Sequence, residues 1–244
     1  MRKLKVSPDS QGNLFAMELP GTIAKFDTSG HSTVFAHITP GNSFTYGYGL
    51  AIDKNGNVFV ANYAADMIEE FDPLGNESIF AHITAPIGLA FDSQGDLWVS
   101  ALDQNVQRFG NNGTGASSVS YGLRNWGLVV DTQDNLYVAD YEINRVGQFD
   151  ANGSYNSGYS VSGFQSPTGV AVDDQSNLFV VTGNGTLRFN SLGVQTGSFS
   201  GSNGFVAFAP AVPEPSSAVM LLGTWGMLLM RNGRPPRARA AYRP

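Results

Sequence analysis

Histidine is the side chain that most often marks acid-base or metal chemistry, and this sequence contains three. His37 and His82 occupy equivalent places in two copies of the sequence FAHIT, which predicts an outer strand rather than a paired metal site. No His-Glu-x-x-His, Gly-x-Ser-x-Gly or phosphate-loop motif occurs, and the absence of cysteine removes thiolate chemistry. The sequence therefore predicts no catalytic set, no metal ligands and no cofactor.

Two carboxylates stand apart from the others. Aspartates recur at one position of a repeated segment, where a turn explains them: Asp53, Asp92, Asp131 and Asp173. Glu18 and Asp140 follow a different pattern, and either could meet a ligand or a divalent cation.

Aromatic side chains that do not recur in every repeat are the stronger candidates for binding, because packing between repeats does not require them. Aromatic rings beside Asn and Asp suit carbohydrate or protein recognition. The candidate ligand-binding residues are Tyr46, Tyr48, Tyr63, Trp126, Asp140 and Tyr141.

These candidates belong to an acidic, glycine-rich globular body. The chain has 244 residues, 42% of them apolar, 14% charged and 29 of them glycine. Residues 1–211 hold nine Lys or Arg and nineteen Asp or Glu, a net charge of −10, whereas residues 212–244 hold five Arg and one Glu, a net charge of +4. An acidic body repels phosphate backbones, so nucleic acid is not an expected partner.

The elements that position the candidates come from a repeat. DSQGNLFAM at Asp9 aligns without gaps with DKNGNVFVA, DSQGDLWVS, DTQDNLYVA and DDQSNLFVV, at spacings of 44, 39, 39 and 42 residues. Each unit supports two hairpins and hence four strands, starting near residues 49, 88, 127 and 169 in units two to five. Such sheets must stack to bury their faces, which predicts a β-propeller. The aromatics after each first turn are expected between blades: Phe15, Phe59, Trp98, Tyr137 and Phe179.

The units resemble the NHL family of β-propellers, most closely in GLVVDTQDNLYVADYEINRVGQFDANG at residues 127–153. The resemblance implies an all-β propeller over residues 1–211, with about five visible blades. GFVAFAP from Gly204 looks like the first strand of a sixth blade, so the ring is either five-bladed or an incomplete six-bladed one.

The C-terminal segment 212–244 is of another kind. After Pro213-Glu214-Pro215 comes an uncharged stretch, residues 216–230, and then arginines that include Arg231 and Arg234. As a helix that stretch would be about 22 Å long, too short for the roughly 30 Å core of a bilayer. We expect a short apolar helix here.

This order of motifs resembles the PEP-CTERM sorting signal of exported bacterial proteins. The resemblance implies exosortase-type sorting machinery as a partner, transient membrane contact through residues 216–230, and delivery to the cell surface or extracellular matrix. An N-terminal signal peptide is not visible, since MRKLKVSPDSQGN lacks an apolar run.

Two functions are compatible with these features. The first is a noncatalytic binding or scaffold module for a protein or carbohydrate. The second is a propeller enzyme, because the blades also resemble streptogramin lyases and gluconolactonase-like propellers, which implies a divalent cation in the central channel as one option. The missing catalytic constellation favours the first.

Overall fold

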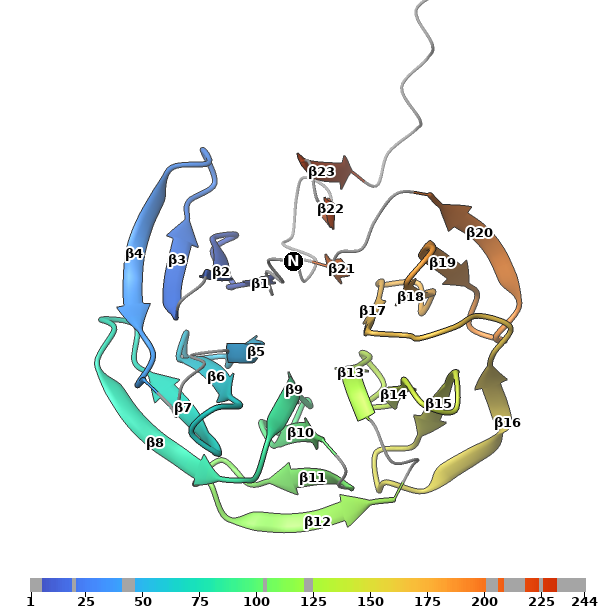
Figure 1. The fold of residues 1–244 in the computed structure, drawn as a ribbon, viewed down its shortest axis with the longest axis horizontal. Helices are drawn as coiled ribbons and strands as arrows, with labels where there is room; N and C mark the ends of the chain where they lie inside the picture. The colour runs from blue at the N-terminus through green and yellow to red at the C-terminus, as the bar shows by residue number, and fades with distance from the viewer. Residues whose placement is uncertain are drawn as a thin grey trace, which may run out of the picture.

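The structure is a ring of β-sheets around a central axis (Figure 1). It is a computed structural model that describes residues 6–18, 21–40, 47–102, 105–120, 125–200, 206–208, 218–223 and 226–231. For residues 6, 47, 48 and 116, and for the strands after residue 200, it describes the backbone alone. Within these ranges the fold is an all-β, five-bladed propeller, as predicted, and each blade is a four-stranded antiparallel sheet.

The strands of each blade run in sequence order from the axis outward (Figure 1). Blade one comprises β1 (Val6–Pro8), β2 (Leu14–Glu18), β3 (Thr22–Phe26) and β4 (Ser32–His37). Blade two comprises β5 (Gly47–Ile52), β6 (Val58–Asn62), β7 (Met67–Phe71) and β8 (Glu77–His82). Blade three comprises β9 (Pro86–Phe91), β10 (Leu97–Ala101), β11 (Val106–Phe109) and β12 (Gly115–Val119). Blade four comprises β13 (Asn125–Val130), β14 (Leu136–Asp140), β15 (Arg145–Phe149) and β16 (Tyr155–Val161). Blade five comprises β17 (Gly169–Val172), β18 (Leu178–Thr182), β19 (Gly185–Phe189) and β20 (Gln195–Phe199).

A three-stranded sheet lies between blades five and one (Figure 1). Its inner strand β21 (Val206–Phe208) contacts both β17 and β1, so it takes the place of the inner strand of a further blade. The other two strands, β22 (Ala218–Gly223) and β23 (Gly226–Arg231), form an antiparallel hairpin closed by the pair Gly223 and Gly226.

This hairpin corrects one expectation, because residues 218–223 and 226–231 are strands and not part of a short apolar helix. Gly223 and Gly226 are only three positions apart. Two glycines so close together destabilise a helix interior and favour a tight turn. The remaining residues of the 212–244 segment, including Pro213, Glu214, Pro215 and Arg234, lie outside the described residues.

Aspartate-capped turns connect the first and second strands of each blade, which confirms their assignment to structure. In blade two, Asp53 Oδ1 accepts hydrogen bonds from the backbone N–H of Asn55 at 2.9 Å and of Asn57 at 2.8 Å. The turn needs a left-handed residue, which is glycine in the first three blades. Asp134 and Ser176 adopt the same conformation in blades four and five, at φ 62° and 58°.

The inner strands approach one another so closely that glycine is required. A Cβ on Gly49 would lie 2.5 Å from the Ile87 carbonyl oxygen, and one on Gly127 would lie 2.7 Å from the Gly169 Cα. This is why the inner strands of blades two to five carry a glycine at this point of the repeat, at residues 49, 88, 127 and 169.

Four apolar clusters hold the blades together, one between each pair of consecutive blades from one to five. Each cluster contains the aromatic that follows the first turn of its earlier blade, and the fifth such residue, Phe179, is also buried. The prediction that these aromatics pack between blades is confirmed for Phe15, Phe59, Trp98 and Tyr137.

Candidate functional site

One face of the ring collects the connections that differ between blades. Because every blade is an antiparallel meander, the connections between its second and third strands lie at the same end as those leading to the next blade. We call this end the loop face, and the opposite end, which carries the aspartate-capped turns, the turn face. Uniform turns position the sheets, so ligand recognition is expected on the loop face.

The structure distributes the predicted binding residues over two places on the loop face. Trp126, Asp140 and Tyr141 lie together in blade four, at the start of β13 and the end of β14. Tyr63 follows β6 in blade two, at the position equivalent to Tyr141, and blade three lies between them. Tyr48 belongs to β5 with its side chain outside the described residues, and Tyr46 lies outside them altogether.

The other candidates lie away from this group. His37 and His82 are on the outermost strands β4 and β8, which confirms their expected position, and His31 is in a turn of blade one. Glu18 ends β2 and is exposed. In the described part of the chain, no group of three or more His, Cys, Asp or Glu side chains is arranged to hold a metal ion.

Trp126 and Tyr141 form an aromatic pair, with ring centroids 5.6 Å apart and planes inclined by 31°. The backbone of Trp126 is fixed by Ser100, whose buried hydroxyl donates to the Trp126 carbonyl oxygen at 2.9 Å. The contact with Trp126 restricts the Tyr141 ring, so a ligand that contacts this ring meets a surface that is already ordered.

Asp140 lies beneath the loop that begins with Tyr141, and it is fully buried. Its Oδ1 accepts hydrogen bonds from the backbone N–H of Glu142 at 2.8 Å and of Ile143 at 3.0 Å. Its Oδ2 is buried and has no hydrogen-bond partner. A buried carboxylate oxygen without a donor is costly, so this atom marks a place where packing alone does not explain the residue.

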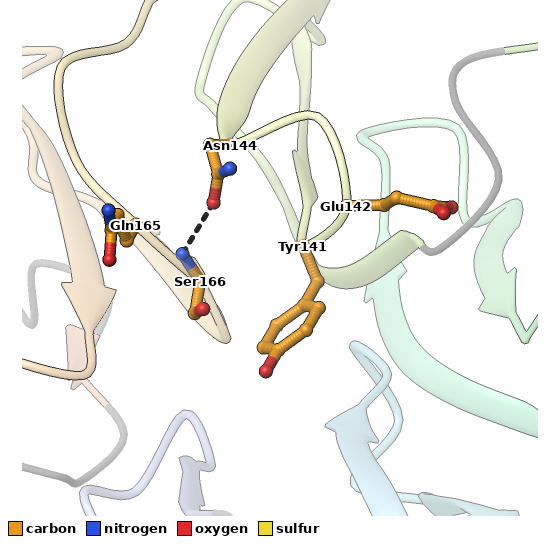
Figure 2. A pocket seen from close by; sticks show the side chains of 5 residues that line it. All are labelled: Tyr141, Glu142, Asn144, Gln165 and Ser166. Carbon is orange, nitrogen blue, oxygen red and sulfur yellow. Dashed lines mark hydrogen bonds between the residues drawn. The ribbon is translucent and has the colours of Figure 1, made fainter.

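A pocket of about 310 Å³ opens between blades four and five beside this loop (Figure 2). It is lined by Tyr141, Glu142, Asn144, Gln165 and Ser166. Asn144 and Ser166 both adopt left-handed backbone conformations, at φ 55° and 52°, and the Ser166 N–H donates to Asn144 Oδ1 at 2.7 Å. This hydrogen bond clamps the loop after β14 to the connection between the two blades.

A second group of polar residues is buried in blade two. Glu69 is fully buried on β7, and its Oε1 accepts hydrogen bonds from the Thr39 N–H at 2.8 Å and from Asn62 Nδ2 at 3.1 Å. Burial raises the pKa of Glu69 above its ordinary value, and the nearby carboxylate of Glu77 adds to the increase. Glu69 thus anchors Thr39, at the start of the connection that leads to Tyr46.

Sequence reasoning missed Glu69 and the pocket residues Glu142, Asn144, Gln165 and Ser166. Glu69 stands in MIEEF, which does not distinguish a buried carboxylate from an exposed one. A position-by-position comparison of the repeats would have identified Glu142, because blade two has Ala64 there.

Comparison with known proteins gives neighbours in fold alone. No family model and no curated protein matches the chain. A protein assigned as a gluconolactonase matches with a TM-score of 0.72 and 13% identity, over 96% of this chain and 94% of that one. A gluconolactonase from Xanthomonas campestris matches with a TM-score of 0.69 and 17% identity, over 88% of this chain and 80% of that one.

An inactive virginiamycin B lyase from Staphylococcus aureus, determined with quinupristin, matches with a TM-score of 0.67 and 14% identity, over 88% of this chain and 76% of that one. The described fold is therefore similar to the propellers of these lyase and gluconolactonase structures. At these identities the likeness concerns the fold and not the site residues.

Proposed function

We propose that the protein is a propeller enzyme of the streptogramin-lyase or gluconolactonase-like kind, with its substrate bound on the loop face beside blade four. The observation that carries the proposal is the fully buried Asp140, which holds the pocket loop with one oxygen and keeps the other without a donor. Buried polar groups of this sort concentrate at functional sites. The fold neighbours named above are lyase and gluconolactonase propellers, which favours the enzyme over a noncatalytic scaffold.

Within this proposal the carboxylates have different roles. Asp140 is a positioning residue, because its Oδ1 fixes the backbone of Glu142. Among the described residues that line the pocket, Glu142 is the acidic one, and its side chain extends away from the other four (Figure 2). Its carboxylate is therefore placed to accept or return a proton at a part of the substrate that reaches beyond Tyr141, outside the space between those four residues.

Ring-opening assays test the enzyme. The full chain is incubated with sugar lactones and with streptogramin B compounds, with and without added divalent cations, and products are followed by mass spectrometry. Hydrolysis adds the mass of one water, whereas elimination leaves the mass unchanged and creates a double bond. Glu142→Gln should lower turnover at least tenfold if Glu142 transfers the proton; equal turnover by the variant, or none by the parent on either class, contradicts the proposal.

A noncatalytic binding module is the second candidate, and the ordered Trp126 and Tyr141 pair favours it. Rigid aromatic rings beside amide groups are typical of protein and carbohydrate recognition. Specific binding on a glycan array, with no product from any ring-opening substrate, would select this candidate.

We also propose that the protein is exported, with residues 212–244 as a sorting tail recognised by exosortase-type machinery and residues 1–211 as its NHL-like cargo domain. The motif Pro213-Glu214-Pro215, the apolar stretch and the arginines support this. Among the described residues there is no helix long and apolar enough to cross a bilayer.

Cell fractionation tests the export proposal in a host that has the sorting machinery, with a secretion signal supplied. The parent chain should reach the surface, and a Pro213→Ala/Pro215→Ala variant should stay in the inner membrane. Equal export of both chains rules out the sorting motif.

A further inference from the structure

Blade two contains the same clamp as the pocket, built from different residues. Asp66 and Ala85 are left-handed at φ 54° and 50°, and the Ala85 N–H donates to Asp66 Oδ1 at 2.8 Å. In blade four the corresponding hydrogen bond joins Ser166 to Asn144 at 2.7 Å. The preceding loops also match, since Asn62 ends β6 and accepts from the Ala65 N–H just as Asp140 accepts from the Ile143 N–H.

The side chains on the two clamps differ in polarity. Blade two carries Ala64, Thr84 and Ala85, at the positions where blade four carries Glu142, Gln165 and Ser166. Because blade two forms the clamp with small side chains, neither the clamp nor the ring requires the polar ones. The polar side chains of blade four line a pocket and are not needed for folding, so they are candidates for ligand recognition.

The chemistry of the pocket points to an uncharged ligand. Asn144 uses its Oδ1 in the clamp, which leaves its Nδ2 group as a donor, and Asp66 has no such donor. Gln165 adds an amide, Ser166 a hydroxyl and Tyr141 a ring with a hydroxyl, all around the same space (Figure 2). The Glu142 side chain extends away from these four, so the space between them has no ionised group (Figure 2).

The size of the pocket limits the ligand further. A volume of about 310 Å³ is near the lower end of ligand pockets, which run from ~300 to 1,000 Å³, and suits one ring rather than a chain of rings. Amides and hydroxyls beside an aromatic face bind a ring that carries several hydroxyl groups, because the amides meet the hydroxyls while the ring face packs on the aromatic.

We infer that Tyr141, Asn144, Gln165 and Ser166 form a subsite for a neutral, hydroxyl-rich ring of about monosaccharide size, with Gln165 and Ser166 as its specificity-determining residues. The inference deepens the proposed function, since it names the chemical class bound at the same site. It does not depend on turnover, because the subsite is defined by binding.

The first test replaces the two residues by those that blade two uses, Gln165→Thr with Ser166→Ala. The probe is methyl α-D-glucopyranoside, followed by saturation-transfer NMR and calorimetry with the full chain. Losing two side-chain hydrogen bonds should weaken binding about tenfold or more while the melting temperature stays unchanged. Gln175→Thr, an exposed glutamine in a turn-face loop, is the matched control and should bind as the parent does.

A second variant transfers the subsite to blade two by Asp66→Asn, Thr84→Gln and Ala85→Ser, beside the existing Tyr63. It should raise the binding stoichiometry from one to two. This variant decides the question if the first one unfolds: a second equivalent supports the subsite, and none overturns it.

Charged probes test the class of ligand. Glucosamine and gluconate should bind no more tightly than the neutral glycoside, and a tenfold preference for either overturns the assignment to a neutral ring. No binding of the glycoside by the parent chain, or unchanged binding by the first variant, also overturns the inference. Binding that disappears in the first variant while no substrate turns over would leave the subsite standing and remove the proposed enzyme.

Discussion

Replacing Trp98 by Ala is expected to open a cavity between blades three and four and to lower the free energy of unfolding by about 3–5 kcal/mol. Trp98 is only 2% exposed and packs in the cluster that includes Leu128, Val138 and Phe149. Its indole N–H donates to Asp92 Oδ2 at 3.1 Å. The substitution therefore removes apolar contact and one hydrogen bond together.

The free energies lost with the apolar contact and with the hydrogen bond can be estimated separately. A buried aromatic side chain removes roughly 150–250 Å² from water, worth about 4–6 kcal/mol at ~25 cal/mol per Å², part of which the Ala methyl group retains. The hydrogen bond adds only about 1 kcal/mol. Asp92 does not become an unpaired charge, because Arg108 Nη2 lies 2.8 Å from its Oδ2.

Thermal and urea unfolding of the full chain measure the effect. For a chain of this length a loss of 3–5 kcal/mol corresponds to a decrease in Tm of roughly 6–20 °C. The control is Trp98→Phe, the residue that blade two has at the same position as Phe59, and it should cost only about 1–2 kcal/mol. An unchanged Tm for Trp98→Ala, or equal losses for both variants, would refute the assignment of this position to interblade packing.

Three further predictions concern other parts of the ring. Because the folded pKa of Glu69 lies above its ordinary value of 4.5, the folded chain keeps a proton that the unfolded chain loses, so stability falls as pH rises above that value. Glu69→Gln should therefore be more stable than the parent at neutral pH and converge with it in acid; parallel stability curves would contradict a raised pKa. Gly127→Ala would place a Cβ 2.7 Å from the Gly169 Cα and should cost about 1–3 kcal/mol in urea unfolding, whereas Gly183→Ala, which meets nothing within 4 Å, should not. Deleting residues 212–244 removes β22 and β23 but leaves β21 beside β17 and β1, so circular dichroism should show a cooperatively folded propeller, and a broad or absent transition would mean that the hairpin is needed to close the ring.

Repeated local chemistry made the architecture readable from the sequence. The Asp of each first turn and the aromatic after that turn occupy the same place in every blade, and the inner-strand glycine recurs in blades two to five. Each of these residues meets its requirement within its own hairpin or against the adjacent blade. Their spacing therefore predicted the five blades, the starts of strands near residues 49, 88, 127 and 169, and the packing of Trp98. The same comparison placed His37 and His82 on outer strands.

The apolar C-terminal stretch shows where composition alone was insufficient. Residues 216–230 have no charge, which is compatible with a helix or with strands. The described parts of this stretch form strands, because β22 pairs with β21 on one side and with β23 on the other. These pairings, which include Gly223 with Gly226, give the backbone groups their hydrogen-bond partners.

The site depended on tertiary contacts in a way that the fold did not. The sequence by itself identified Trp126, Asp140 and Tyr141, which lie within sixteen positions and whose residue types do not recur in every blade. Gln165 and Ser166 reach the same pocket only because the connection between blades four and five folds back onto the loop after β14, and the burial of Glu69 follows from the packing of Thr39 and Asn62 around it. Periodic patterns specify which face of a strand is buried, whereas contacts between nonrepeated loops depend on the closed ring, so only the tertiary structure could decide them.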